Sequence, residues 1–202
     1  MDPSAIAITF GTIFLVELPD KTFIAALVLS TRYRPLMVWI GVGLAFFVQT
    51  AVAVAAGKLT TLLPDDTIKA VTVAVFLIGA VVLFRTAPGA KAEEKQQEEE
   101  YAARARDPKS GLKAVAASFL VLFAAEWGDL SQLLTISMVA RFDDPVSVFL
   151  GAWVALLTVS GLAILFGRML LRYVRLSVLH YLGSAVCLLL AGVTLYELLS
   201  LP

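Results

Sequence analysis

Long apolar segments separated by short polar ones dominate the chain, and their lengths predict membrane-spanning helices. A helix needs about 20 apolar residues to cross the hydrocarbon core of a bilayer. We expect six such helices, over residues 4–30, 36–57, 68–84, 114–140, 146–166 and 178–199. The pattern therefore predicts an all-α membrane protein with six transmembrane helices.

The composition supports this class and excludes several others. Of the 202 residues 59% are hydrophobic and 16% are charged, which is more apolar surface than a soluble domain can bury. The sequence has no basic patch with interleaved aromatic residues, so nothing in it indicates a nucleic-acid partner. The single cysteine, Cys187, excludes an intrachain disulfide and a cysteine-based metal cluster. The first apolar segment lacks a basic leader, so we expect a transmembrane helix rather than a cleaved signal.

The second half of the chain repeats the first at widely spaced positions. A shift of 109 aligns Glu17 with Glu126, Asp20 with Asp129, Thr22 with Ser131 and Arg32 with Arg141. Slightly larger shifts align Gly41 with Gly151, Thr50 with Ser160, Gly57 with Gly167 and Gly79 with Gly192. The order of these matches along the chain indicates an internal repeat.

Each half contains three predicted helices, so the two copies must enter the membrane from opposite sides. This arrangement is an inverted repeat with a pseudo-two-fold axis in the membrane plane. We expect residues 1–87 to form the first three-helix repeat, 88–112 a charged linker and 113–202 the second three-helix repeat.

The charged linker bears on the orientation of the chain. Its acidic run over residues 93–100 is interpreted as part of a solvated connector, with a metal-sensing or partner-binding segment as the alternative. Twelve Lys and Arg residues lie in the connections on the linker side and three on the other side. The positive-inside rule then predicts a cytoplasmic linker and both termini outside. The length and the lack of a targeting sequence favour a bacterial inner membrane.

Two short acidic motifs interrupt the apolar segments 4–30 and 114–140. Each charge at the centre of a membrane helix costs about 2.5–3.5 kcal/mol, so ionisable groups there indicate a functional site. In a continuous helix Glu17 would share a face with Asp20, as Glu126 would with Asp129. The two-fold relation between the halves then predicts that all four carboxylates meet near mid-membrane.

The side chains of these motifs favour a hard divalent cation. Besides the carboxylates, the motifs offer the hydroxyls of Thr22 and Ser131 and the amide of Gln132. Oxygen ligands suit Ca²⁺, Mg²⁺ or Mn²⁺ better than Cu(I) or Zn²⁺. Crowded carboxylates in a low dielectric hold protons when no cation is bound, and an arriving cation displaces them. This chemistry predicts exchange of a cation for protons.

Glycine and proline in the motifs affect the local backbone. Pro19 leaves the carbonyl of Leu15 without its helical donor, which either exposes an oxygen to the cation or merely kinks the helix. Gly128 loosens the matching place in the second motif. Among the neighbouring residues, we expect Trp127 to form a wall of the site. We expect Gln49 to bond a neighbouring helix, with a place in the ion pathway as the alternative.

The two motifs, Glu17-Leu-Pro-Asp-Lys-Thr22 and Glu126-Trp-Gly-Asp-Leu-Ser-Gln132, resemble the twin E-x-G-D-[KR]-[ST] signature of a family of divalent cation–proton exchangers. That family, within the wider cation/calcium exchanger superfamily, includes bacterial manganese exporters and Golgi and chloroplast manganese/calcium transporters. The resemblance implies that Glu17, Asp20, Glu126 and Asp129 bind the transported ion, with Thr22, Ser131 and Gln132 in support.

This sequence departs from the signature at two positions. Pro19 stands where the family has glycine, and Leu130 stands where it has Lys or Arg, which leaves the site more negative than usual.

The sequence thus predicts a secondary transporter, not an enzyme, that exports Mn²⁺ or Ca²⁺ in exchange for protons. We expect no resident cofactor. The expected partners are the divalent cation and the lipid bilayer, with no obligate protein partner evident and a homo-oligomer left open. An intramembrane carboxylate-dependent enzyme (a protease or a metal hydrolase) and a passive cation channel are the alternatives.

Overall fold

All regular structure in the part of the chain that we describe is α-helical. The computed structural model describes residues 1–18, 20–60, 64–105, 109–173 and 176–200, without the side chains at 65, 168, 170–173 and 176. Nine helices follow one another through these residues: α1 (Pro3–Glu17), α2 (Lys21–Arg32), α3 (Pro35–Thr60), α4 (Asp65–Thr86), α5 (Ala90–Arg104), α6 (Leu112–Ala125), α7 (Leu130–Phe142), α8 (Pro145–Tyr173) and α9 (Leu176–Leu199). The predicted all-α class is confirmed.

Four of these helices, α3, α4, α8 and α9, are each long and apolar enough to cross a membrane. Helices α6 and α7 together supply enough apolar length for a fifth span, which is bent by 75° at the break between them. Helix α1 is a shorter apolar helix of 15 residues. The described residues therefore contain four or five candidate spans, which makes the chain a multi-pass membrane protein.

The prediction of unbroken helices over 4–30 and 114–140 is wrong. The first segment divides into α1 and α2, and the second into α6 and α7. The apolar pattern continues across each interruption, and hydropathy alone cannot register the local backbone change that ends one helix and starts another. The motif acids lie at these two interruptions.

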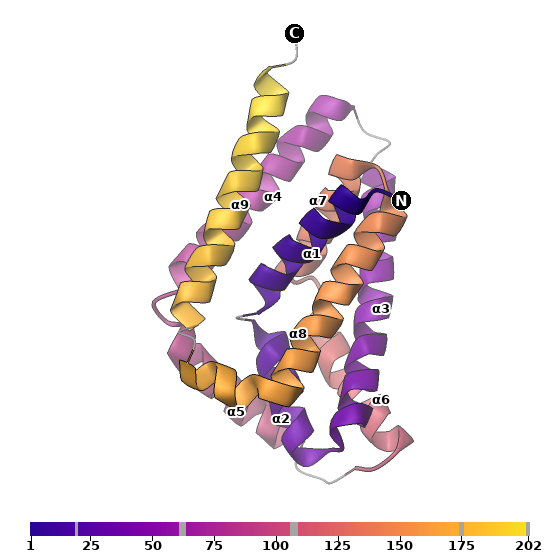
Figure 1. The fold of residues 1–202 in the computed structure, drawn as a ribbon, viewed down its shortest axis with the longest axis vertical. Helices are drawn as coiled ribbons and strands as arrows, with labels where there is room; N and C mark the ends of the chain where they lie inside the picture. The colour runs from indigo at the N-terminus through magenta and orange to yellow at the C-terminus, as the bar shows by residue number, and fades with distance from the viewer. Residues whose placement is uncertain (19, 61–63, 106–108, 174–175, 201–202) are drawn as a thin grey trace.

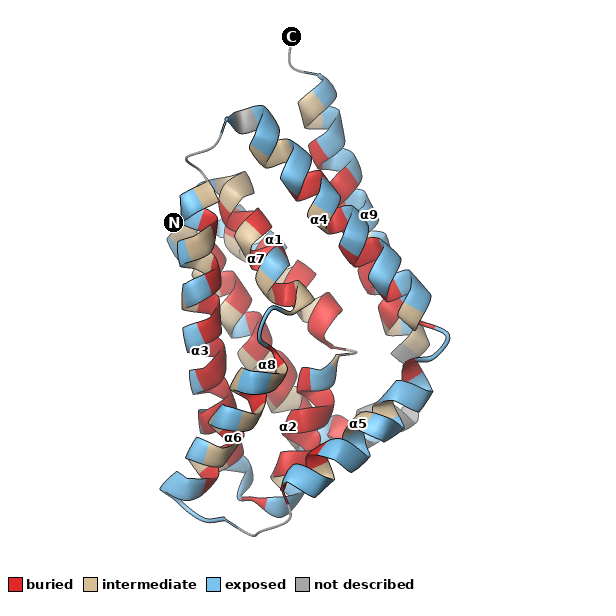
Figure 2. Cartoon of the chain, turned by 180° about the vertical axis from the view of Figure 1, so that it is seen from behind, coloured by how far each residue is buried: buried red, intermediate tan, exposed pale blue. Residues whose placement is uncertain are grey.

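The bundle is elongated, with α4 and α9 packed side by side along one flank (Figure 1). Helices α3 and α8 contact each other, and they also pack against α6 and α1, respectively. Both ends of the described chain lie toward one end of the bundle, and α5 crosses the other (Figure 1). Buried residues face inward, whereas α4 and α9 leave large apolar side chains such as Ile78 and Leu189 exposed (Figure 2). Such an apolar exterior suits contact with lipid.

Glycines at matched positions let the two halves pack in the same way. A Cβ added to Gly41 of α3 would lie 2.4 Å from the carbonyl oxygen of Val115 on α6. A Cβ added to Gly151 of α8 would lie 2.7 Å from the carbonyl oxygen of Ile6 on α1. Only glycine permits so close an approach of two helix backbones. The pairs α3–α6 and α8–α1 are therefore built alike.

Two stacked phenylalanine pairs also occupy matched positions. The rings of Phe10 and Phe14 in α1 are stacked with their centroids 5.6 Å apart. The rings of Phe119 and Phe123 in α6 are stacked at 5.4 Å. Both pairs follow the shift of 109 residues seen in the sequence, so the repeat extends to side-chain packing.

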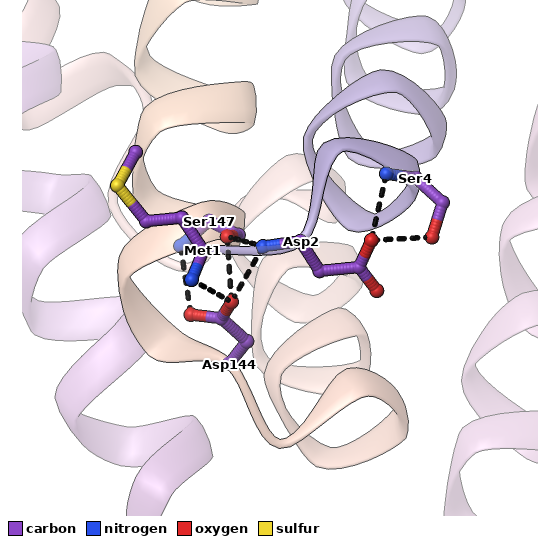
Figure 3. A network of polar contacts seen from close by, with 5 residues as sticks. All are labelled: Met1, Asp2, Ser4, Asp144 and Ser147. Atoms are coloured by element: carbon purple, nitrogen blue, oxygen red, sulfur yellow. Dashed lines mark hydrogen bonds and ion pairs between the residues drawn. The ribbon is translucent and has the colours of Figure 1, made fainter.

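A polar network joins the start of α1 to the start of α8 (Figure 3). The backbone N–H of Asp2 donates to the Asp144 carboxylate at 3.0 Å and to the Ser147 hydroxyl at 2.8 Å. Ser147 also donates to Asp144 through its hydroxyl, at 2.6 Å, and through its backbone N–H. These hydrogen bonds lower the pKa of Asp144 to about 2. The stability that the ionised Asp144 carboxylate contributes is therefore complete above the unfolded pKa of about 3.9 and is lost as the pH falls through about 2.

Part of the linker is anchored to the bundle. It contains α5, which packs against α2 and buries Tyr101 and Ala105. Tyr101 is only 4% exposed, and burial raises the pKa of its hydroxyl. The acidic run itself is mostly exposed, as a solvated connector would be, whereas the apolar residues that follow it anchor α5 to the bundle.

We expect Gly41→Ala and Gly151→Ala each to destabilise the protein by about 1–3 kcal/mol, because the added methyl group overlaps a backbone carbonyl. The measurement is the melting temperature in detergent, which falls by about 2–4 °C per kcal/mol for a chain of this size. Gly11→Ala is the matched control, since a Cβ there meets no atom within 4 Å. Equal melting temperatures for all three variants would contradict the expectation.

Candidate metal site

Both pairs of motif acids stand where a helix is interrupted. Helix α1 ends at Glu17, and Asp20 precedes α2 with an extended backbone (φ −96°, ψ 175°). Helix α6 ends immediately before Glu126, and Asp129 precedes α7 with an extended backbone (φ −72°, ψ 168°). Gly128 has a φ of +79°, in the region that favours glycine. The helix cannot continue through this conformation.

A tight turn, rather than a shared helix face, brings the acids of each pair together. The N–H of Asp20 donates to the carbonyl of Glu17 at 3.0 Å, and the N–H of Asp129 donates to the carbonyl of Glu126 at 3.4 Å. The prediction that each pair shares one face of a continuous helix is therefore wrong. The structure nevertheless pairs the same acids, because a turn also brings residues three apart in the sequence close together.

The four carboxylates meet at one place between the two breaks. Glu17, Asp20, Glu126 and Asp129 each offer an oxygen, and these oxygens all lie within 4.8 Å of one another. Neither Asp20 nor Asp129 uses its side chain to cap the helix that it precedes. Their carboxylates thus remain available to a ligand. Four acidic side chains from two distant parts of the sequence form one cluster.

Burial makes this cluster costly without a bound cation or protons. Glu17 is 1% exposed and Glu126 is 3% exposed. Both oxygens of each, and Oδ2 of Asp129, have no hydrogen-bond partner among the described residues. Buried polar atoms are normally paired, so a group of unpaired ones calls for a ligand. A divalent cation matches both the charge and the oxygen chemistry of this cluster.

The two predicted supporting hydroxyls lie beside the carboxylates. Thr22 is fully buried and Ser131 is 7% exposed. Both hydroxyls are near the carboxylate of Glu17, without a hydrogen bond to it. Oγ1 of Thr22 is itself without a partner among the described atoms. These positions are compatible with supporting ligands, and their role stays a prediction.

Gln132 and Gln49 hold the second break in shape. The Gln132 amide donates to the carbonyl of Glu126 at 2.7 Å and accepts the N–H of Gly128 at 3.2 Å. Its amide is thereby engaged with the backbone, and a ligand role for it stays a prediction. Gln49 donates to the carbonyl of Phe123 at 3.1 Å, in the last turn of α6. The expectation that Gln49 bonds a neighbouring helix is confirmed.

A cavity of about 710 Å³ reaches the acids from the side of α5. Asp20 and Asp129 line it, and α5 contributes the side chains of Glu93, Gln96, Gln97, Glu100, Tyr101 and Arg104. A much smaller cavity of about 10 Å³ touches Glu126 from the side of α3. Asp20 and Asp129 are therefore accessible from the linker side.

Two further expectations can be compared with the structure. Trp127 does not form a wall of the site, because it is 58% exposed and packs against Phe123 with the ring centroids 5.0 Å apart. Pro19 lies outside the described residues, so both interpretations of it remain open.

The polar face of α5 was missed by reasoning from the sequence. Glu93, Gln96, Gln97 and Glu100 recur at helical spacing, which is a signal for one common face. The run of like charges around them obscured that spacing, since such runs are usually solvated. Nothing local indicates that this face lies over a site formed by residues far away in the sequence.

We expect Glu17→Gln to raise the melting temperature of the metal-free protein at pH 8, because a neutral amide relieves repulsion within the buried cluster. The rise should be at least about 3 °C, which corresponds to about 1 kcal/mol for a chain of this size. Saturating Mn²⁺ should raise the melting temperature of the unsubstituted protein but not of the variant. Glu98→Gln, an exposed change on α5, is the control. A lower melting temperature for Glu17→Gln would contradict the expected repulsion.

Comparison with known proteins yields one family. The family model described as "Divalent cation/proton antiporter GDT1" matches residues 5–91 and 114–201. The chain is 31% identical to Protein PAM71, chloroplastic, of Arabidopsis thaliana over 98% of this chain and 58% of that protein. It is 35% identical to the GDT1-like protein sll0615 of Synechocystis over 66% of this chain and 70% of that protein.

The rice (Oryza sativa subsp. indica) GDT1-like protein 1, chloroplastic, is 29% identical over 96% of this chain and 62% of its own length. The chain thus spans about three fifths of the length of the chloroplast relatives it matches. No solved structure matches it. Because the family model covers both halves of the chain and leaves out only the linker region and the ends, the protein belongs to the GDT1 family of divalent cation/proton antiporters.

Proposed function

We propose that this protein exports Mn²⁺ or Ca²⁺ across a membrane in exchange for protons, with the four-carboxylate cluster as the ion site. The observation that carries the proposal is the meeting of four carboxylate oxygens within 4.8 Å of one another, with both glutamates buried and their oxygens unpaired among the described residues. Glu17, Asp20, Glu126 and Asp129 would bind the ion directly. Thr22, Ser131 and Gln132 would support it.

The charge balance of the cluster favours exchange over one-way binding. A divalent ion offsets two of four negative charges, and its departure leaves four close carboxylates in a poorly solvated site. Protons are the compact cations that can replace it there. The carboxylates are then neutralised in both halves of the transport cycle, by the metal ion in one half and by protons in the other. The same acids therefore serve both substrates.

The helix ends around the cluster assist a cation. The carboxyl ends of α1 and α6 lie at the two breaks. The carbonyl groups of a helix end carry a partial negative charge, which favours a nearby cation. Interrupted helices whose ends lie near mid-membrane are a recurring feature of transporter ion sites.

We further propose that the fold is a six-span inverted repeat, in which α1 with α2 and α6 with α7 each form one broken span. The support is the matched packing at Gly41 and Gly151 and the matched acids at the two breaks. Such a repeat permits two mirrored conformations, each open on one side of the membrane. The wide cavity under α5 corresponds to the conformation open on the linker side.

The excess of Lys and Arg on the linker side favours a cytoplasmic linker, so uptake of the ion through this cavity would start export. By the same orientation both chain ends would lie outside. The proposed location is a bacterial inner membrane.

The two alternatives fit the site less well. An intramembrane protease or hydrolase needs an acid and a base in different environments. Here the two halves supply matched acids from matched turns. A passive channel needs a continuous polar path. The cavity on the α3 side of the acids holds about 10 Å³, room for about one water molecule.

We expect Glu17→Gln, Asp20→Asn, Glu126→Gln and Asp129→Asn each to lower the rate of Mn²⁺ transport at least tenfold, because each removes a charged ligand. The measurement is ion flux into proteoliposomes with Mn²⁺, Ca²⁺ or Mg²⁺, with and without an imposed pH gradient. Glu98→Gln should transport normally. Full transport by all four variants would place the ion site elsewhere, and flux independent of the pH gradient would favour a channel.

A further inference from the structure

Helices α4 and α9 form a pair that packs more closely against α7 and α1 than against α6 and α2. Helix α4 packs against α7, and α9 packs against α1. In the described part of the chain, any contact of α4 with α6 or of α9 with α2 is slight by comparison. The cavity under α5 lies where those contacts would be, since its walls include Leu83 of α4, His180 of α9, Lys21 of α2 and Ala125 of α6.

Leu130 lies where the α4–α9 pair contacts α7 beside the site, and we call this contact of Leu130 with Gly79 the joint. A Cβ added to Gly79 of α4 would lie 3.2 Å from Cδ1 of Leu130 and 3.5 Å from Sγ of Cys187 on α9. Leu130 directly follows the site acid Asp129. The leucine side chain thus packs into a gap left by a glycine, where α4, α7 and α9 meet.

The matched joint in the other half of the repeat is open. The residues that correspond to Leu130 and Gly79 are Lys21 and Gly192. Both Lys21 and Leu130 line the cavity. Gly192, however, has no atom within 4 Å of an added Cβ, and Lys21 is exposed whereas Leu130 is half-buried. One joint is therefore closed with a leucine, while its counterpart is open with a lysine.

We propose that Leu130 is a positioning residue that holds α4 and α9 in the conformation open on the linker side (the linker-open conformation), and that Lys21 disfavours the mirrored conformation. This proposal rests on the inverted repeat and alternating access of the proposed function. In the mirrored conformation Gly192 would approach position 21, and α4 would approach α6. Closing that joint requires packing a charged ammonium group against apolar helices, which is unfavourable. The apolar joint at Leu130 has no such cost.

The test measures how open the cavity is without measuring transport. Ala125, on the cavity wall, is changed to cysteine in a Cys187→Ala background, and its rate of reaction with a charged maleimide is followed in detergent. Lys109→Cys, exposed in the connection before α6, gives the rate for a fully accessible thiol. The ratio of the two rates reports the linker-open population.

We expect Leu130→Lys to lower this ratio about twofold, which is the result of a tenfold shift in an equilibrium that starts near 10:1. Exchanging the two residues, in Lys21→Leu with Leu130→Lys, should lower it further. Leu133→Lys, an exposed leucine of α7, should leave it unchanged. If Leu130→Lys fails to fold, Leu130→Ala should shift the ratio in the same direction by a smaller factor.

An unchanged ratio in the exchanged variant would overturn the proposal, and so would an equal fall in Leu133→Lys. Flux through the unsubstituted protein in proteoliposomes separates this outcome from a failure of the proposed function. Normal flux with an unchanged ratio removes the role of Leu130 and leaves the antiporter. A lowered ratio without flux keeps the joint and removes the antiporter.

Discussion

Repulsion among four buried carboxylates is the constraint on which the rest of this structure depends. Their oxygens lie within 4.8 Å of one another, and two of the four side chains are almost wholly removed from solvent. Such a cluster opposes folding unless something positive shares it. The fold therefore has to supply packing energy elsewhere, and it has to leave a route by which cations and protons arrive. The glycine-mediated contacts of α3 with α6 and of α8 with α1 supply the first requirement. The cavity beneath α5 supplies the second.

The helix class and the place of the acids could be predicted from the sequence, because both depend on local or repeated patterns. Apolar length indicates a membrane helix, and the shift of 109 residues pairs Glu17 with Glu126 and Asp20 with Asp129. The two helix breaks could not be predicted in the same way. Gly128 indicated a weak point, but its left-handed backbone is a tertiary choice that few other residues would allow. The docking of α5 was equally hidden, because it depends on distant residues that meet Tyr101 only in the folded chain.

Helix α5 of the linker lines the approach to the site, which its composition alone does not indicate. A charged run is usually a solvated surface, and much of α5 is indeed exposed. One face, however, places Glu93, Gln97 and Glu100 along the same cavity as the site acid Asp20. A hydrated cation that approaches the site from this side meets oxygen groups before it meets the buried cluster. The position of α5, anchored by Tyr101, therefore shapes the approach to the site as well as linking the two halves.

Two matched halves need differences if the protein is to prefer one conformation. An exact two-fold repeat would give both mirrored states the same energy, so any preference must come from positions where the halves diverge. Gln49 is one such position, because it braces the end of α6, whereas its counterpart Val159 has no donor to offer the end of α1. Lys21 and Leu130 are another. Both differences give the second half the better-braced break and the tighter joint. The end of α1 and the joint at Lys21, both in the first half, therefore have fewer contacts that resist a conformational change.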